Sequence, residues 1–268
     1  MSVTGHPPPL AGEPLACEEF GHGIGRPDGI LVLRYRSAGV LDLDRGRQDF
    51  LHQLYWAPAG LLAVTRSGTP DFLGPGEAYW AQRGVDHEVR ALDQAVAYRV
   101  CLREVPAALA TCRAGPVRVD EVASRLLTSL LRADLPLEDA LAARAGFLAA
   151  LRPADGAEQA EVHVRGGRGY ARTVARALAR DPADPTDLAG WARRLHVSTK
   201  TLQRDVERSY GLSWTHWRTR VRLRAARALL ATQPVGVTAA RVGYASPSAF
   251  VAAYAREFGH TPGREGRM

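Results

Sequence analysis

Short apolar stretches alternate with turn-forming residues in the first part of the chain. Apolar runs occupy residues 30–35, 61–65 and 95–102, and glycine, proline and aspartate lie between them, as at 67–70 and 74–76. Short apolar runs bounded by such residues are typical of β-strands. Many strands at close spacing predict a small barrel or sandwich in this part of the chain.

The pattern changes to helical spacing after the strands. Apolar residues recur every three or four positions between 119 and 131, and Pro136 begins a second such segment that runs to about residue 151. A stretch rich in glycine and proline at 153–169 then indicates a linker. The two helices predict either a dimerisation element or a cover for the barrel, and the sequence leaves both interpretations open.

The remainder of the chain is helical in pattern, and the pattern repeats. Residues 195–202 match residues 243–250 with an offset of 48 residues. Equivalent positions are Ser198 and Ser246, Leu202 and Phe250, and Gly211 and Gly259. Serine accepts hydrogen bonds from the free amides of a first helical turn, and glycine adopts the left-handed conformation that ends a helix. The repeat therefore predicts two capped helices, each with one buried stripe.

Each capped helix follows a shorter apolar helix, predicted at 185–195 and at 235–242. A short helix, a tight turn and a second helix form the helix-turn-helix layout, in which the second helix enters the major groove of DNA. A long helix over 213–231 joins the two units. Its length of roughly 27 Å is close to the distance of about 34 Å between successive major-groove faces. One chain could therefore place both recognition helices on one face of a duplex.

Charge is distributed unevenly along the chain. The net charge of +7 is made of +12 in residues 165–268 and −5 in residues 1–164. A mildly acidic part joined to a strongly basic part is typical of a sensor joined to a polyanion-binding domain. Three cysteines without Cys-x-x-Cys spacing argue against a disulfide framework or a zinc ribbon. No apolar run approaches a membrane span and no signal pattern opens the chain, so we expect a cytoplasmic protein.

The sequence VGYASPSAF at 242–250, followed by FGHTP at 258–262, resembles the AraC/XylS family of transcription regulators. The C-terminal domain of that family consists of two helix-turn-helix units joined by one long helix. The resemblance, which covers about residues 168–265, implies an α+β multidomain chain that binds promoter DNA sequence-specifically and responds to a ligand. The expected parts are a cupin-like β-barrel in residues 1–105, a helical connector in 106–164, and an all-α tandem helix-turn-helix domain in 165–268.

The resemblance also implies which residues contact DNA. In the first unit Lys200, Gln203 and Arg204 would face bases, because arginine pairs with guanine and glutamine with adenine. Neighbouring hydroxyls and the arginines of the long helix would face phosphates. The full expected set is Ser198, Thr199, Lys200, Thr201, Gln203, Arg204, Arg218, Arg222, Arg224, Ser246, Ser248 and Ala249.

The second unit departs from the family pattern. Its recognition helix offers Ser248, Ala249 and Ala252 to DNA, none of them a long polar residue. Gly236 and Thr238 stand where a capping threonine and a core isoleucine are usual in the family. We therefore expect this unit to read little base sequence and to act through backbone contacts and DNA shape.

The front part resembles the cupin-type barrel found at the N-terminus of many members of that family. Gly76, Gly84 and His87 keep the spacing of one cupin motif. His52 keeps part of the other motif, whose second histidine position is occupied by Leu54. Metal-binding cupins need three or four histidine or glutamate ligands, so two histidines lead us to expect no metal, no cofactor and no catalysis.

Three roles are open for these histidines. They could line a pocket for a small-molecule effector, because such pockets are mostly apolar with a few polar groups. The candidate lining residues are His52, Tyr55, Trp80 and His87. The other interpretations are a structural role in the barrel core and a weak two-histidine metal site.

The main hypothesis is a one-component regulator whose barrel senses a signal and whose tandem units bind a promoter. Expected partners are double-stranded promoter DNA, a small-molecule effector, a second copy in a homodimer, and RNA polymerase if the protein is an activator. The alternatives are a metal-dependent cupin enzyme with a DNA-binding tail, a DNA-repair methyl acceptor, and a nucleoid-type binder. The missing third ligand and the single cysteine before residue 100 argue against the first two. Gln203 and Arg204 argue against the third.

Overall fold

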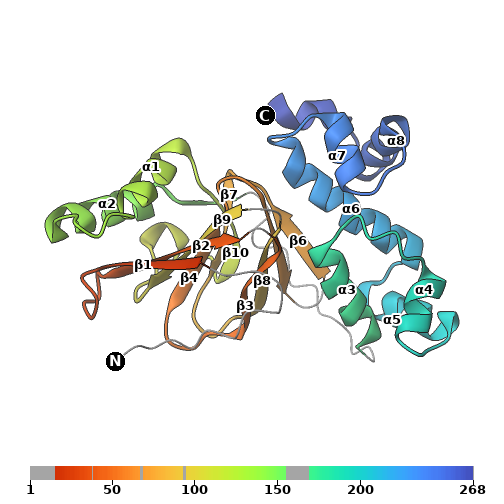
Figure 1. Ribbon diagram of the computed structural model, residues 1–268, viewed down its shortest axis with the longest axis horizontal. Coiled ribbons are helices and arrows are strands. Elements are labelled where there is room, and N and C mark those ends of the chain that lie inside the picture. Colours follow the sequence, from red (N-terminus) through yellow and green to blue (C-terminus); the bar gives the residue numbers. More distant parts are fainter. Residues whose placement is uncertain (1–15, 38, 67–68, 93–94, 155–168, 268) are drawn as a thin grey trace.

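The computed structural model describes residues 16–37, 39–66, 69–92, 95–154 and 169–267. Figure 1 shows two lobes side by side: the N-terminal part of the chain forms a β-rich lobe, and the C-terminal part forms a helical lobe. The expected β-rich region followed by a helical C-terminal domain is therefore confirmed.

The strands form two antiparallel sheets with the orders β1-β2-β9-β4-β7-β10-β11 and β3-β8-β5-β6. The larger sheet contains β1 (Ala16–His22), β2 (Ile30–Ser37), β9 (Ala95–Leu102), β4 (His52–Trp56), β7 (Glu77–Ala81), β10 (Ala114–Arg118) and β11 (Arg152–Pro153). The smaller sheet contains β3 (Leu41–Arg47), β8 (Asp86–Leu92), β5 (Leu61–Arg66) and β6 (Thr69–Leu73).

The two sheets enclose the first apolar core of the β-rich lobe. Tyr55 and Tyr79 from the larger sheet pack there with Leu62, Val64 and Val89 from the smaller one. Because side chains alternate between the faces of a strand, the neighbours of these residues lie on the outer faces. Two facing antiparallel sheets are compatible with the cupin-like barrel expected from the sequence, and the cupin assignment itself stays a prediction.

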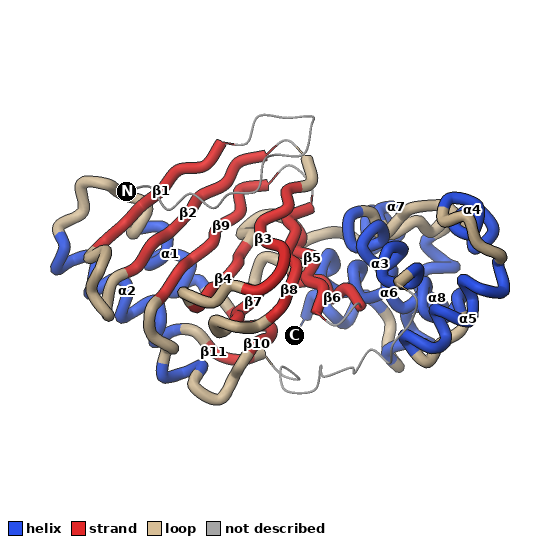
Figure 2. The backbone as a smooth tube through the Cα atoms, turned by 90° about the horizontal axis from the view of Figure 1, so that it is seen from below, coloured by secondary structure: helices blue, strands red, loops and turns tan. Residues whose placement is uncertain are grey.

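Two helices, α1 (Glu121–Ser129) and α2 (Leu137–Ala150), cover the outer face of the larger sheet. Leu127 on α1 and Phe147 on α2 share a core with Trp80 of the sheet, and Figure 2 shows both helices lying along it. Of the two interpretations left open, packing on the barrel is what the structure shows, and a role in dimerisation stays a prediction.

The sequence pattern had indicated a helical connector, but the connector is not purely helical. It also contains the short 3-10 helix η1 (Ala107–Leu109) and the strands β10 and β11. β10 pairs with β7, and β11 pairs with β10, so the connector extends one edge of the larger sheet. These segments are too short for a periodic pattern, which is why they escaped the sequence analysis.

The helical lobe is organised around α6 (Trp214–Leu230), whose 17 residues span about 25 Å. The other helices are α3 (Tyr170–Arg180), α4 (Leu188–Arg194), α5 (Thr199–Tyr210), α7 (Val235–Arg241), α8 (Pro247–Phe258) and the 3-10 helix η3 (Pro262–Arg267). Trp217 and Val221 on α6 share one core with Leu202 on α5 and Phe250 on α8. That shared core fixes the positions of α5 and α8 relative to α6.

The helical lobe docks on the outer face of the smaller sheet. Leu61 on β5 and Phe72 on β6 belong to the same apolar core as α3 and α6. Gly74, just after β6, lies so close to α6 that an added Cβ would be 2.6 Å from the carbonyl oxygen of Ala228. The two backbones can approach this closely only because residue 74 has no side chain.

A cluster of charged side chains surrounds this docking face. Arg90 on β8 is 2% exposed and lies 2.6 Å from Asp42 and 3.0 Å from Glu88. Arg176 on α3 also donates to Glu88, with Nε 2.8 Å from Oε1. Burial raises the pKa of Glu88, but the hydrogen bonds from Arg176 and Arg90 outweigh it and hold that pKa below its ordinary value. The cluster therefore ties α3 to the smaller sheet by charge as well as by apolar packing.

Candidate DNA-binding interface

The first helix-turn-helix unit consists of α4 and α5. Asp187 caps α4 by accepting a hydrogen bond of 2.7 Å from the amide of Gly190. His196 has a φ of 54°, which turns the chain sharply after α4. Ser198 then caps α5 by accepting from the amide of Thr201 at 3.0 Å. The expected serine cap and the left-handed Gly211 at the end of α5, with φ 70°, are both confirmed.

The structure exposes the start of α5 to solvent. Thr199, Lys200, Gln203 and Arg204 are all exposed, whereas the helix buries Leu202 against the domain core. These polar side chains therefore lie where a recognition helix presents them to a major groove. Their contacts with bases stay a prediction.

The second unit, α7 and α8, has the same local design. Ser246 accepts from the amide of Ala249 at 3.3 Å, and Gly259 ends α8 with a φ of 76°. Ser248 and Ala249 are exposed at the start of the helix, so this unit presents few groups that can read bases. Thr238 on α7 is fully buried, and its hydroxyl has no hydrogen-bond partner among the described residues. A polar atom thus occupies a core position of this unit.

Arg222 on α6 clamps two segments of the helical lobe. Its guanidinium donates to the carbonyl oxygens of Pro182, Ala183 and Asp184 before α4, at 3.2 to 3.3 Å, and to that of Gly243 before α8, at 3.3 Å. Burial lowers the pKa of Arg222 below its ordinary value. A phosphate contact of Arg222, expected from the sequence, stays a prediction, and its donors bind the backbone of both units in this structure.

Arg218 and Arg224 are also engaged within the protein. Arg218 donates to the carbonyl oxygen of Asp184, and burial lowers its pKa. Arg224 Nη1 lies 2.8 Å from the carboxylate of Asp71 on β6, so it joins α6 to the β-rich lobe. The phosphate contacts expected of these two arginines likewise stay predictions.

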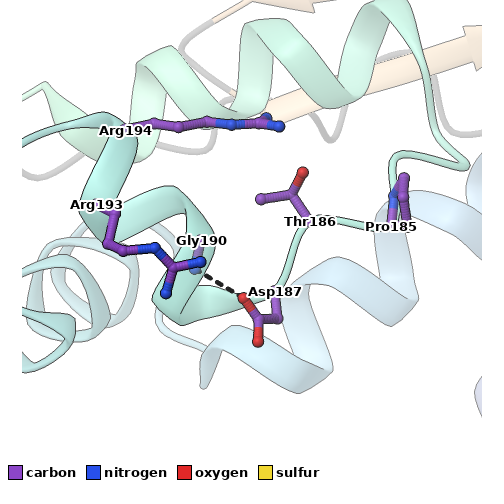
Figure 3. Close-up of a pocket in the computed structure, with 6 residues that line it drawn as sticks. All are labelled: Pro185, Thr186, Asp187, Gly190, Arg193 and Arg194. Carbon is purple, nitrogen blue, oxygen red and sulfur yellow. Dashed lines mark hydrogen bonds between the residues drawn. The ribbon is translucent and has the colours of Figure 1, made fainter.

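Two arginines that the sequence analysis overlooked lie beside the first unit. Arg193 and Arg194 are exposed at the end of α4 and line a cavity of about 470 Å³ with Thr186, Asp187 and Gly190; Figure 3 shows their side chains around it. The first helix of such a unit crosses the DNA backbone. An adjacent arginine pair on that helix was the signal that could have identified them.

The four residues proposed to line an effector pocket fall into two groups. Tyr55 and His87 face the core between the sheets, where His87 Nε2 lies 3.2 Å from the Tyr55 hydroxyl. His52 instead stacks on Trp80 at 5.8 Å, and Trp80 belongs to the core under α1 and α2. The strand alternation of the larger sheet thus separates the two groups on opposite faces.

Hydrogen bonds within the barrel occupy its histidines. His87 Nδ1 is 2.9 Å from the carbonyl oxygen of Val85, and His52 Nδ1 accepts from the amide of Arg83 at 3.2 Å. Burial, aided by the nearby Arg83, lowers the pKa of His52 below its ordinary value. Within the described ranges no cluster of three or more histidine, cysteine, aspartate or glutamate side chains has the arrangement of a metal site. The helices among those residues include none long and apolar enough to span a bilayer.

Comparisons with known proteins place residues 191–267 in a helix-turn-helix domain family. Over 93 residues the chain is 41% identical to the HTH-type transcriptional regulator RipA of Corynebacterium glutamicum, a match that covers 34% of this chain and 28% of RipA. It is 32% identical over 94 residues to the HTH-type transcriptional regulator NimR of Escherichia coli, which covers 35% of this chain and 34% of NimR. The matches thus span about a third or less of these relatives.

Among solved structures, the C-terminal domain of AraT, a response regulator from Geobacillus stearothermophilus, is 26% identical with a TM-score of 0.35. That match covers 38% of this chain and 85% of the AraT domain. The residues that match the family model, 191–267, begin within α4 and include α5, α6, α7 and α8. Residues 191–267 are therefore a helix-turn-helix domain similar to those of HTH-type transcriptional regulators.

Proposed function

We propose that the protein is a sequence-specific transcription regulator in which α5 reads bases in the major groove of promoter DNA. The observation that carries the proposal is the exposed start of α5. Lys200, Gln203 and Arg204 project there from a helix that Ser198 caps, in a domain whose family binds DNA. Glutamine and arginine have the paired polar groups that distinguish adenine and guanine in that groove.

The second unit anchors the complex and contributes little base reading. Its recognition helix presents Ser248 and Ala249 at positions where the first unit presents long polar side chains. Free amides at the start of α8 and the Ser248 hydroxyl suit phosphate oxygens, which carry no sequence information. α6 holds α5 and α8 in one core, so binding by the first unit brings the second to the same face of the duplex.

Phosphate contacts come chiefly from arginines outside α6. Arg193 and Arg194 lie on the helix that crosses the DNA backbone, and Arg208 is exposed farther along α5. Residues 165–268 carry a net charge of +12, so we expect affinity to fall steeply with salt as bound counterions are released.

The β-rich lobe is proposed to act as the sensor, with residues 1–105 as the barrel, 106–164 as the connector and 165–268 as the DNA-binding domain. The sensing role is proposed to be non-catalytic and to use a small-molecule effector at Tyr55 and His87, the two members of the expected pocket that lie together. A homodimer and a contact with RNA polymerase complete the proposal, and a cytoplasmic location is compatible with promoter binding.

Selection from a pool of random duplexes at about 150 mM salt tests the proposal, because non-specific binding is weakened under those conditions. We expect one strongly enriched block, read by α5, next to a weakly enriched block one helical turn away. Two equally strong blocks would overturn the anchoring role of α8. Tight binding without enrichment would overturn base reading.

Replacement of single side chains on α5 refines the test. Arg204→Ala or Gln203→Ala is expected to cost about 1–3 kcal/mol on the selected site and to relax its base preference there. Arg208→Ala is the comparison on the same helix: as a proposed phosphate contact near the C-terminal end, it is expected to weaken binding to random and selected DNA alike and to leave the base preference unchanged. An equal loss on random and selected DNA for Arg204→Ala would show that this arginine contacts only phosphates.

A further inference from the structure

The connector contains a cavity that the proposed DNA contacts do not use. It has a volume of about 270 Å³ and lies between α2 and the segment that includes η1. Its walls are mainly small and apolar, with Val105, Pro106, Ala145 and Leu148 among them, and its polar groups are Glu104 and Arg144. This volume is at the lower end of the range for small-molecule sites, which are mostly apolar with a few polar groups.

Arg144 is a buried cation whose nearest carboxylate among the described residues is 3.9 Å away. Its side chain is 10% exposed, and its Nε has no hydrogen-bond partner in the part of the chain that the structure describes. The carboxylate of Glu104 is 3.9 Å from Nη2, beyond hydrogen-bond distance, and is 57% exposed. Asp28, another acid in its surroundings, is already bonded to Arg26 at 2.8 Å. A buried charge with so little compensation is costly and calls for a partner.

Other buried or partly buried arginines of the protein differ from Arg144 in this respect. Arg90 has two carboxylates within 3.0 Å, and Arg222 donates to four backbone carbonyls. Arg218 donates to the carbonyl oxygen of Asp184. Arg144 combines a poorly compensated guanidinium with a place on the wall of a cavity.

We propose that this cavity binds a small monocarboxylate, with Arg144 as its anchor and the apolar walls around its hydrocarbon part. A guanidinium pairs with a carboxylate through two parallel charge-assisted hydrogen bonds, which are among the strongest that proteins form. The exposed Glu104 side chain can turn into water when an anion enters. The size of the cavity suits an acid such as benzoate or hexanoate rather than a long-chain one.

Calorimetric titration of the full chain with benzoate and hexanoate, and with the uncharged benzamide and hexanamide, tests the proposal. We expect each acid to bind at least about tenfold more tightly than its amide, because only the acid offers a charged acceptor to Arg144. Equal binding of acid and amide, or no binding of either acid at about 10 mM, would overturn the proposal.

Two variants locate the site, and one serves as the control. Arg144→Met is expected to abolish the preference for acids over amides, and Arg125→Met, at an exposed arginine on α1, is expected to preserve it. If Arg144→Met does not fold, Ala145→Leu fills the cavity from an exposed helical position, keeps the guanidinium, and is expected to weaken both acids about tenfold. If the variant that folds, Arg144→Met or Ala145→Leu, still binds the acids as the unchanged chain does, the proposed site is refuted.

Binding of the selected duplex by the same preparations keeps this site distinct from the proposed function. The ligand-free Arg144→Met variant is expected to bind DNA as tightly as the unchanged chain, because the cavity lies in the connector and away from α5 and α8. A chain that binds acids but no DNA would overturn the proposed function alone, and a chain that binds DNA but no acid would overturn the site alone.

Discussion

Arg222→Ala offers the clearest test of how the two helix-turn-helix units are held together. The side chain donates four hydrogen bonds, of 3.2 to 3.3 Å, to backbone carbonyls that precede α4 and α8. A hydrogen bond to a charged group contributes about 1.5–3 kcal/mol when measured singly. These four share one guanidinium, are longer than ideal, and leave carbonyls that water can reach. We therefore expect a total loss of about 2–4 kcal/mol in the free energy of unfolding.

Urea unfolding of the full chain measures that loss, and the salt dependence of DNA binding shows its cause. If Arg222 is a clamp, Arg222→Ala lowers the stability and weakens DNA binding but leaves the slope of log affinity against log salt concentration (the salt slope) unchanged. Arg220→Ala is the control on the same helix, because its exposed pair with Glu257 at 2.7 Å is expected to contribute about 1 kcal/mol or less. Unchanged stability with a salt slope reduced by about 1 would show that Arg222 binds phosphate, and would refute the clamp.

Three further predictions concern the docking face and the second unit. Gly74→Ala is expected to lower the free energy of unfolding by about 1–3 kcal/mol, because the added Cβ would meet the Ala228 carbonyl. Gly76→Ala, at an open position, is the control and is expected to change the stability in urea little. Equal losses in the two variants would contradict the close approach of Gly74 to α6. Thr238→Val is expected to raise the free energy of unfolding by about 1 kcal/mol, since it removes a buried hydroxyl that has no partner among the described residues and keeps the shape of the side chain. A lower urea midpoint in this variant would mean that the hydroxyl has a partner. The lowered pKa of Glu88 stabilises the fold above the ordinary glutamate pKa, near 4.5, and that contribution is lost as the pH falls below it. Urea midpoints between about pH 6 and pH 3 should therefore decline less in Glu88→Gln, and parallel declines would exclude this carboxylate as the cause.

Local signals in the sequence were sufficient to predict the helices of the DNA-binding domain. Ser198 and Ser246 cap their helices, and Gly211 and Gly259 end them in the left-handed conformation, as the repeat had indicated. Capping and helix termination depend on residues within one turn of each other, so a single sequence carries the information. The boundaries of the long helix were predicted for the same reason, since Ser213 caps it.

Long-range partners could not be predicted in this way. Five arginines lie within α6, and the sequence pattern shows only that they avoid its apolar stripe. That Arg222 binds carbonyls of two distant turns, and that Arg224 binds Asp71 on β6, follows from how the chain folds back on itself. The sequence could not predict the faces of the barrel residues either. Tyr55 on β4 and Trp80 on β7 lie on opposite faces of the larger sheet, and this can be assigned only when both strands and their register are known.

In the proposed regulator, the arrangement around α6 offers a route from the barrel to DNA. α6 carries the core that holds α5 and α8, and it also packs on β6 beside Gly74. The smaller sheet is a single layer: Val89 faces the barrel core, and its neighbour Arg90 faces the docked helices. A ligand between the sheets is therefore one layer of side chains away from the docking face. Because closely packed interiors transmit displacement rather than absorb it, a ligand that favours one position of this sheet favours one position of both recognition helices together.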